Sequence, residues 1–147
     1  MSLHGSYDDE NLFAKILRGE IPSVKVMEDD VALAFMDLFP QARGHTLVAP
    51  KGVKARNFLD LPGEKVGPLM ERVQRVAIAV EKALKPDGVV VTQFNGAPAG
   101  QTIFHLHFHI IPRYEGVPLA GHGHSKKAEI PELQTIARAI WDAYESP

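Results

Sequence analysis

The segment from Ile103 to Ile111 alternates more strictly than any other part of the chain, and it constrains the fold most. It reads Ile-Phe-His-Leu-His-Phe-His-Ile-Ile, which places three of the seven histidines within five residues. Successive side chains of a strand point to opposite faces, so His105, His107 and His109 would share one face. Apolar side chains would pack into a core on the other face, at Phe104, Leu106, Phe108 and Ile110. A slip of one residue would bury three imidazoles, so the register is strongly fixed.

Hydrophobic periodicity predicts the remaining elements. Further strands are expected at 24–28, 31–37, 45–51 and 89–94, with a hairpin turn at Asp29-Asp30. Helices are expected at 11–18, 62–84 and 131–144, each with one apolar stripe. Residues 1–10 are polar and predict a loosely ordered leader. Five strands in mostly antiparallel order with a few helices indicate an α+β fold.

Charge and cysteine content exclude several classes of function. Sixteen Lys and Arg against eighteen Asp and Glu give a net charge of -2, which argues against a nucleic-acid partner. No cysteine is present, which excludes disulfides, thiolate zinc sites, iron–sulfur clusters and a cysteine nucleophile. The chain shows neither a signal-peptide pattern nor an apolar run near the ~20 residues that span a bilayer. We therefore expect a cytoplasmic protein without a membrane partner.

Three imidazoles on one strand face suit a division of labour better than a shared metal ion. Neighbours at i and i+2 lie roughly 6.5–7 Å apart and the outer two roughly 13 Å, whereas metal–nitrogen bonds are about 2.0–2.1 Å. Two of the three could share an ion, but all three could not. The alternative is that one neutral ring attacks while its neighbours orient it, bind anionic oxygens or move a proton. A single histidine on a strand is usually structural, but three on one face are not typical of strand composition.

The loop from Asn95 to Thr102 precedes this strand and brings Asn, Gln and Thr side chains close to its first residues. Gly96 and Gly100 would let backbone N–H groups approach an anion closely, which favours a phosphate-binding loop over an ordinary connection. His122 and His124 lie in a Gly- and Lys-rich stretch that indicates a mobile loop, where they are incidental or scavenge metal weakly.

Four ordered motifs resemble those of the histidine-triad (HIT) family. His105 to Ile111 is similar to the family's His-φ-His-φ-His-φ-φ signature, where φ is apolar. Residues 11–22 resemble its first helix, residues 34–45 its Asp…Pro-Gln-x-x-x-His segment, and residues 99–102 its Gly-Gln-Ser/Thr motif. The resemblance implies a five-stranded antiparallel sheet with two main helices, extended across a homodimer. It also implies a HIT domain core at 11–113, followed by a C-terminal extension with a helix at 114–147.

The implied activity is release of a purine nucleoside monophosphate from adenylated or guanylated compounds such as phosphoramidates and mixed adenylates. By resemblance His107 is the nucleophile that forms a nucleotidyl-histidine intermediate. His105 and His109 would orient it and contact phosphate oxygens, and His45 would support the strand as a fourth imidazole. Dinucleoside polyphosphate hydrolysis within the same family stays open, with Arg113 and Lys51 as candidates for contacting a longer polyphosphate.

The resemblance also implies a binding role for other residues. Gln101 and Thr102 would hydrogen-bond the phosphate or the leaving group, with Asn95 and Gly100 nearby. Asp37 would hold the ribose hydroxyls. The base pocket would be lined by apolar side chains, at Leu12, Phe13, Ile16 and Phe35.

No cofactor and no obligatory metal are expected. Many bacterial members carry Cys-x-x-Cys on the first helix for structural zinc, and the matching positions here are Asn11 and Ala14. His45 and His105 remain candidates for a weakly bound ion. A non-catalytic nucleotide- or metal-binding protein is the alternative from another functional class.

Overall fold

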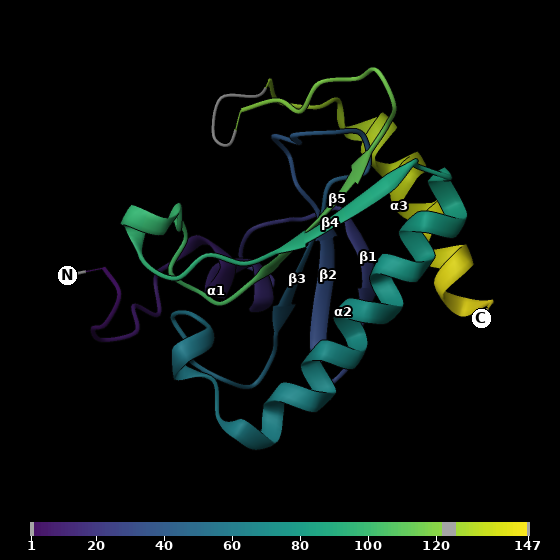
Figure 1. Cartoon of the computed structure of the whole chain (residues 1–147). Coiled ribbons are helices and arrows are strands. Elements are labelled where there is room, and N and C mark those ends of the chain that lie inside the picture. The colour runs from purple at the N-terminus through teal and green to yellow at the C-terminus, as the bar shows by residue number, and fades with distance from the viewer. Residues whose placement is uncertain (1, 122–125, 147) are drawn as a thin grey trace.

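One five-stranded antiparallel sheet forms the centre of the molecule, as the computed structural model shows for residues 2–121 and 126–146 (Figure 1). The strands are β1 (Lys25–Glu28), β2 (Ala32–Met36), β3 (Thr46–Pro50), β4 (Gly88–Thr92) and β5 (Phe108–Arg113). Their order across the sheet is β1-β2-β3-β5-β4, and every neighbouring pair is antiparallel. The predicted α+β fold with a five-stranded antiparallel sheet is confirmed.

Two long helices cover one face of the sheet, α2 (Gly63–Leu84) and α3 (Ile130–Glu145). Both lie on the same side of the strands in Figure 1. Together with the sheet they enclose the larger apolar core, in which Val76 of α2, Ile140 of α3 and Ile110 of β5 have no exposed surface. Because α3 contributes to this core, the C-terminal helix is packed as part of the same unit as the sheet.

The short helix α1 (Leu12–Leu17) lies against the opposite face. The Asn11 side chain accepts a hydrogen bond from the Ala14 N–H and so caps the first turn. Phe13 and Ile16 pack with apolar side chains of β2 and β3 into a second, smaller core, which contains Leu33, Phe35, Leu47 and Ala49. Six residues cannot cover a five-stranded sheet, so part of this face is left to other contacts.

The histidine segment departs from the predicted continuous strand. Only Phe108 onward belongs to β5, and residues 103–105 form bends. The Leu106 N–H donates to the Ala55 carbonyl, at 2.8 Å, rather than to a strand of the sheet. Leu106, Phe108 and Ile110 join the larger core as predicted, and the histidines do not. The prediction that Phe104 packs into this core is wrong, because Phe104 lies in the bend, is partly exposed and packs against the Arg56 guanidinium.

Strand β4 forms one edge of the sheet, where the apolar run Val89–Val91 predicts burial on both faces. Val90 and Val91 are 37% and 47% exposed. The sequence interpretation of a buried strand is therefore wrong for this chain taken alone, because β4 has a hydrogen-bonded neighbour only on its β5 side.

The N-terminal segment makes more contacts than the sequence predicts for it. The Arg56 guanidinium donates to the carbonyls of Ser2 and Ser6, and the Asn57 side chain donates to the Leu3 carbonyl. The expectation for His122 and His124 lies outside the described residues. Within the described part of the chain, no helix is both long and apolar enough to cross a bilayer.

Candidate active site

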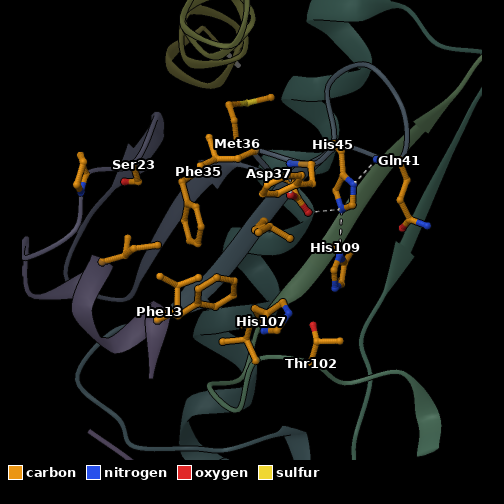
Figure 2. Close-up of a pocket in the computed structure, with 17 residues that line it drawn as sticks. Phe13, Ser23, Phe35, Met36, Asp37, Gln41, His45, Thr102, His107 and His109 are labelled. Carbon is orange, nitrogen blue, oxygen red and sulfur yellow. Dashed lines mark hydrogen bonds and ion pairs between the residues drawn. The ribbon is translucent and has the colours of Figure 1, made fainter. Parts of the chain in front are cut away.

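A cavity of about 340 Å³ lies on the α1 face of the sheet, within the size range of small-molecule sites (Figure 2). Register explains its position, since Phe35 of β2 pairs with Leu47 of β3, which pairs with His109 of β5. This row runs from an apolar end beside Phe13 to a polar end at the histidines. One cavity therefore combines an apolar slot with a cluster of imidazoles.

Nine residues predicted from the sequence line this cavity: Leu12, Phe13, Ile16, Phe35, Asp37, His45, Thr102, His107 and His109. They come from α1, from β2, from β5 and from the loops that precede β3 and β5. Four predicted residues do not line it, namely Asn95, Gly100, Gln101 and His105. The structure thus brings together in one cavity the residues expected around base, ribose and nucleophile, and leaves the other four outside its lining.

His107 is held in one orientation by its own backbone. Its Nδ1 lies 2.7 Å from the carbonyl oxygen of His105. A carbonyl oxygen can only accept, so Nδ1 carries the hydrogen, and the neutral ring has its lone pair on Nε2. The ring also stands edge-on to Phe13, with centroids 4.7 Å apart, and is only 8% exposed. This arrangement orients the ring at the cavity, and its neutral form would suit nucleophilic attack through Nε2.

A directional chain of hydrogen bonds links His45 to His109. The Gln41 backbone N–H donates to Nδ1 of His45, at 3.0 Å. In the neutral ring the His45 hydrogen is therefore on Nε2, which lies 2.9 Å from Nδ1 of His109 and donates to it. The neutral His109 ring then carries its hydrogen on Nε2. Figure 2 shows the contacts of His45 with Gln41 and His109, and His109 lines the cavity.

Asp37 lies just after β2 and is partly exposed in the cavity wall. Its Oδ1 accepts from the Phe39 N–H, at 2.8 Å, and its Oδ2 lies 3.5 Å from Nε2 of His45. The carboxylate is thus oriented by two contacts. A partly exposed carboxylate in a cavity wall can accept hydrogen bonds from ligand hydroxyls.

His105 faces away from this cavity. Its Nε2 donates to the Pro50 carbonyl, at 3.1 Å, and its Nδ1 lies 2.6 Å from the hydroxyl of Tyr7. Burial lowers the pKa of His105 below its usual value, against a smaller opposing effect of the Pro50 hydrogen bond. His105 is therefore a neutral, buried ring that contributes through its contacts and not through exposure to a ligand.

The loop before the histidines is held together by Gln101. This amide accepts from the Gly96 N–H and donates to the carbonyls of Arg56 and Ile103. The Asn95 side chain accepts from the Phe58 N–H. Gly100 has a φ of +108°, which favours glycine, and its N–H donates to Ala97. The polar groups expected to cradle a phosphate are thus engaged within the loop and with the segment at Arg56 and Phe58 in this structure.

Asp37, His45 and His109 form the candidate metal-binding group among the described residues. Each offers one ligand atom, and these atoms lie within 4.8 Å of one another. Two imidazole nitrogens and a carboxylate oxygen suit a divalent transition metal. The His45–His109 hydrogen bond occupies the same nitrogens, so a metal would replace the proton between them. The structure does not join His45 with His105, whose nitrogens contact Pro50 and Tyr7.

Sequence reasoning missed several residues around the cavity, including Gln41 and Phe39. Phe39 is half exposed, and a large aromatic in a turn-rich loop beside Asp37 was an available signal. Gln41 contributes through its backbone N–H, for which no side-chain pattern exists, and its amide also donates to the Ala120 carbonyl. Tyr7 was missed because 98 positions separate it from His105.

Comparison with known proteins identifies relatives of the chain. Residues 18–116 match the family model described as the HIT domain. The chain is 40% identical over 113 residues to adenosine 5'-monophosphoramidase HNT1 of Saccharomyces cerevisiae, covering 77% of this chain and 68% of that protein. It is 40% identical over 104 residues to adenylylsulfatase HINT3 of Arabidopsis thaliana, covering 71% of this chain and 52% of the relative.

A solved structure is similar over nearly the whole chain. It is a Hit-like protein from Bartonella henselae, described as involved in cell-cycle regulation, with a TM-score of 0.88 and 49% sequence identity. The likeness covers 95% of this chain and 99% of that one. The similarity therefore includes α3 as well as the sheet.

Proposed function

Because the chain belongs to the HIT domain family, we propose that it releases a purine nucleoside monophosphate from adenylated or guanylated substrates. The reaction would proceed through a nucleotidyl-histidine intermediate on His107. The observation that carries this proposal is the hydrogen bond from Nδ1 of His107 to the His105 carbonyl, because it directs the lone pair of the neutral ring to Nε2.

In the first step Nε2 of His107 attacks the α-phosphorus, and the bond between phosphorus and the leaving group breaks. In the second step water attacks the same phosphorus, and the bond to Nε2 breaks. Over both steps water supplies an oxygen to the nucleotide and a proton to the leaving group. Dividing one difficult displacement into two easier ones is the advantage of covalent catalysis.

His109 would assist at the phosphate and the leaving group. The hydrogen bonds from Gln41 to His45 and from His45 to His109 put the hydrogen of the neutral His109 ring on Nε2. This Nε2–H can donate a hydrogen bond where negative charge develops. Thr102 lines the same end of the cavity and adds a hydroxyl. For Gln101, Asn95 and Gly100 we propose a contribution through the shape of the loop, because their polar groups bond within it and to the neighbouring segment at Arg56 and Phe58.

The other half of the cavity would hold the nucleoside. Asp37 accepts hydrogen bonds from the ribose hydroxyls, and the base enters the apolar slot between α1 and β2, which is lined by Leu12, Phe13, Ile16 and Phe35. This division matches adenosine 5'-monophosphoramidase HNT1 and adenylylsulfatase HINT3, whose names state substrates with an adenylyl group.

The wall of the cavity favours a small leaving group over a long polyphosphate. Among the described residues that line it, none is Lys or Arg. Lys51 pairs with Glu28, and Arg113 lies at the end of β5. Phosphoramidates and mixed adenylates therefore come first, and dinucleoside polyphosphates second.

We also propose that the chain forms a homodimer through β4. Val90 and Val91 expose apolar surface along an edge strand, and Ile78 of α2 is 48% exposed. Such an edge offers backbone groups for pairing with another strand. Analytical ultracentrifugation should give twice the chain mass, and Val91→Lys should lower it toward one chain mass; a monomer at every concentration contradicts this proposal.

The function is tested by trapping the intermediate. The protein is incubated with adenosine phosphoramidate or a diadenosine polyphosphate carrying a radiolabelled α-phosphate, and then quenched in alkali. We expect an acid-labile, alkali-stable adduct that His107→Ala abolishes and His4→Ala, which removes an exposed histidine, retains. Nucleotide binding without turnover or adduct would indicate a non-catalytic binding protein, and an adduct that persists in His107→Ala would exclude His107 as the nucleophile.

A further inference from the structure

Tyr7 lies outside the region that matches the family model, yet it touches the histidine segment. Its hydroxyl is 2.6 Å from Nδ1 of His105, and the two rings meet edge-on with centroids 5.7 Å apart. The family match begins at residue 18. The contact therefore joins the N-terminal segment to the residue whose carbonyl orients His107.

The direction of this hydrogen bond follows from the other side of the His105 ring. The Pro50 carbonyl can only accept, so Nε2 carries the hydrogen and Nδ1 of the neutral ring must accept. Tyr7 is then the donor. Burial raises the pKa of the Tyr7 hydroxyl and lowers the pKa of His105, so the phenol keeps its proton and the ring stays neutral.

His105 is linked to His107 through its own backbone carbonyl. Two hydrogen bonds hold the His105 ring, one from Tyr7 and one to Pro50, where residues 103–105 bend out of the sheet. The carbonyl of the same residue accepts the hydrogen from Nδ1 of His107. The same peptide group is also held on its other side, because the Leu106 N–H donates to the Ala55 carbonyl at 2.8 Å. The side-chain contacts of His105 act together with this bond in setting the direction of the His105 carbonyl.

The segment that carries Tyr7 is itself held in place. Arg56 donates to the Ser2 carbonyl at 2.8 Å, and Asn57, which is fully buried, donates to the Leu3 carbonyl at 2.9 Å. The Ala97 N–H donates to the Ser2 hydroxyl, so the segment also contacts the loop before the histidines. The segment that precedes Tyr7 is thus fixed by hydrogen bonds to the rest of the molecule.

We propose that Tyr7 is a positioning residue: its hydroxyl holds the His105 ring in one tautomer and thereby aims the carbonyl that orients His107. The inference rests on the proposed function, in which His107 is the nucleophile. Tyr7 does not line the cavity. Its removal should therefore change the rate of the chemical step and leave substrate binding unchanged.

The test compares Tyr7→Phe with Tyr114→Phe. Tyr114 also donates its hydroxyl to a backbone carbonyl, that of Arg43 at 2.9 Å, so the second variant loses an equivalent hydrogen bond elsewhere. We expect kcat to fall about tenfold in Tyr7→Phe with KM within twofold, because slight misplacement of a catalytic group slows the reaction. Tyr114→Phe should keep the wild-type kcat.

Imidazole nitrogen NMR gives a readout that does not require turnover. The wild-type protein should show His107 as a single tautomer with its hydrogen on Nδ1, and Tyr7→Phe should show a mixture. Unchanged spectra, or a kcat equal to that of Tyr114→Phe, would overturn the positioning role. Absence of turnover in the wild type together with changed spectra would overturn the proposed function alone.

A second replacement covers the case in which Tyr7→Phe does not fold. Incorporation of 3,5-difluorotyrosine at position 7 keeps the ring and hydroxyl and makes the hydroxyl a stronger donor. The Nδ1 resonance of His105 should then shift in the folded protein, together with a change in kcat. A resonance that does not move would contradict the inferred hydrogen bond.

Discussion

The two faces of the sheet are covered in different ways. On one face α2 and α3 form a continuous apolar core around residues such as Val76, Ile110 and Ile140. On the other face the six-residue α1 covers only part of the strands. This face also carries a cavity, which is lined by imidazoles, a carboxylate and apolar side chains. Strand β5 takes part in both faces, because Phe108 and Ile110 pack into the core whereas His109 lines the cavity.

The strongest test of this separation is His107→Ala. Removing the proposed nucleophile from the α1 face should lower kcat at least about 1,000-fold, because covalent catalysis is lost. The free energy of unfolding should change far less than after a core truncation, which denaturant titration measures. A loss of folding as large as the loss of activity would show that the two faces are not separate.

Ile140→Ala makes the reciprocal change in the core. This side chain is fully buried in α3, so its truncation should lower the free energy of unfolding by about 2–5 kcal/mol. At a temperature where the variant is folded, kcat and KM should equal those of the wild type. The matched control is Leu12→Ala, which removes a partly exposed cavity residue and should raise KM with little effect on unfolding.

Asp37→Ala should show which end of the cavity binds the sugar of the nucleotide. Loss of a charged hydrogen-bonding group should weaken binding of ribonucleotides about 10- to 100-fold. Binding of the 2'-deoxy analogue should weaken much less, as calorimetry can measure for both ligands. Equal losses for the two nucleotides would mean that Asp37 does not contact the sugar.

His105 should make stability depend on pH. Burial lowers its pKa in the folded protein from the ordinary value of 6.5, so the unfolded chain binds a proton first as pH falls. The stabilisation is complete above pH 6.5 and is lost as pH falls toward the folded value, with a slope of up to about 1.4 kcal/mol per pH unit. Denaturant titrations between pH 7 and 5 should give a shallower slope for His105→Gln; identical slopes would contradict this assignment.

The smallest expected effect is that of removing metal. The nitrogens of His45 and His109 that could bind an ion already share a hydrogen bond, so chelation by EDTA should leave kcat unchanged. Metal analysis of the purified protein provides the control. Activity that disappears with EDTA and returns with stoichiometric zinc would contradict a metal-free site.

Alternation in the histidine segment correctly predicted core positions for Leu106, Phe108 and Ile110, but not for Phe104, which lies in the bend at 103–105. It did not predict that the regular strand begins only at Phe108, because the bend is stabilised by contacts with Ala55 and Pro50, far away in the sequence. Local patterns carry the spacing of side chains, but they carry no information about such distant partners.

The apolar run of β4 illustrates a different limit. Three successive valines indicate burial on both faces, yet the strand forms an edge with Val91 nearly half exposed. The sequence pattern of a strand shows that its side chains are apolar, but it does not show whether residues of the same chain cover them. Similarly, the lining role of Asp37 followed from a motif, whereas that of the Gln41 backbone depends on geometry alone.

The anchoring of residues 2–7 has a practical consequence for anyone who purifies this protein. The Ser2 carbonyl and hydroxyl, the Leu3 carbonyl and the Tyr7 hydroxyl are all hydrogen-bonded. An affinity tag fused in front of them, or a protease that trims them, would alter the segment that carries Tyr7, the proposed positioning residue. Kinetic comparisons between variants should therefore use chains that share the same residues 2–7.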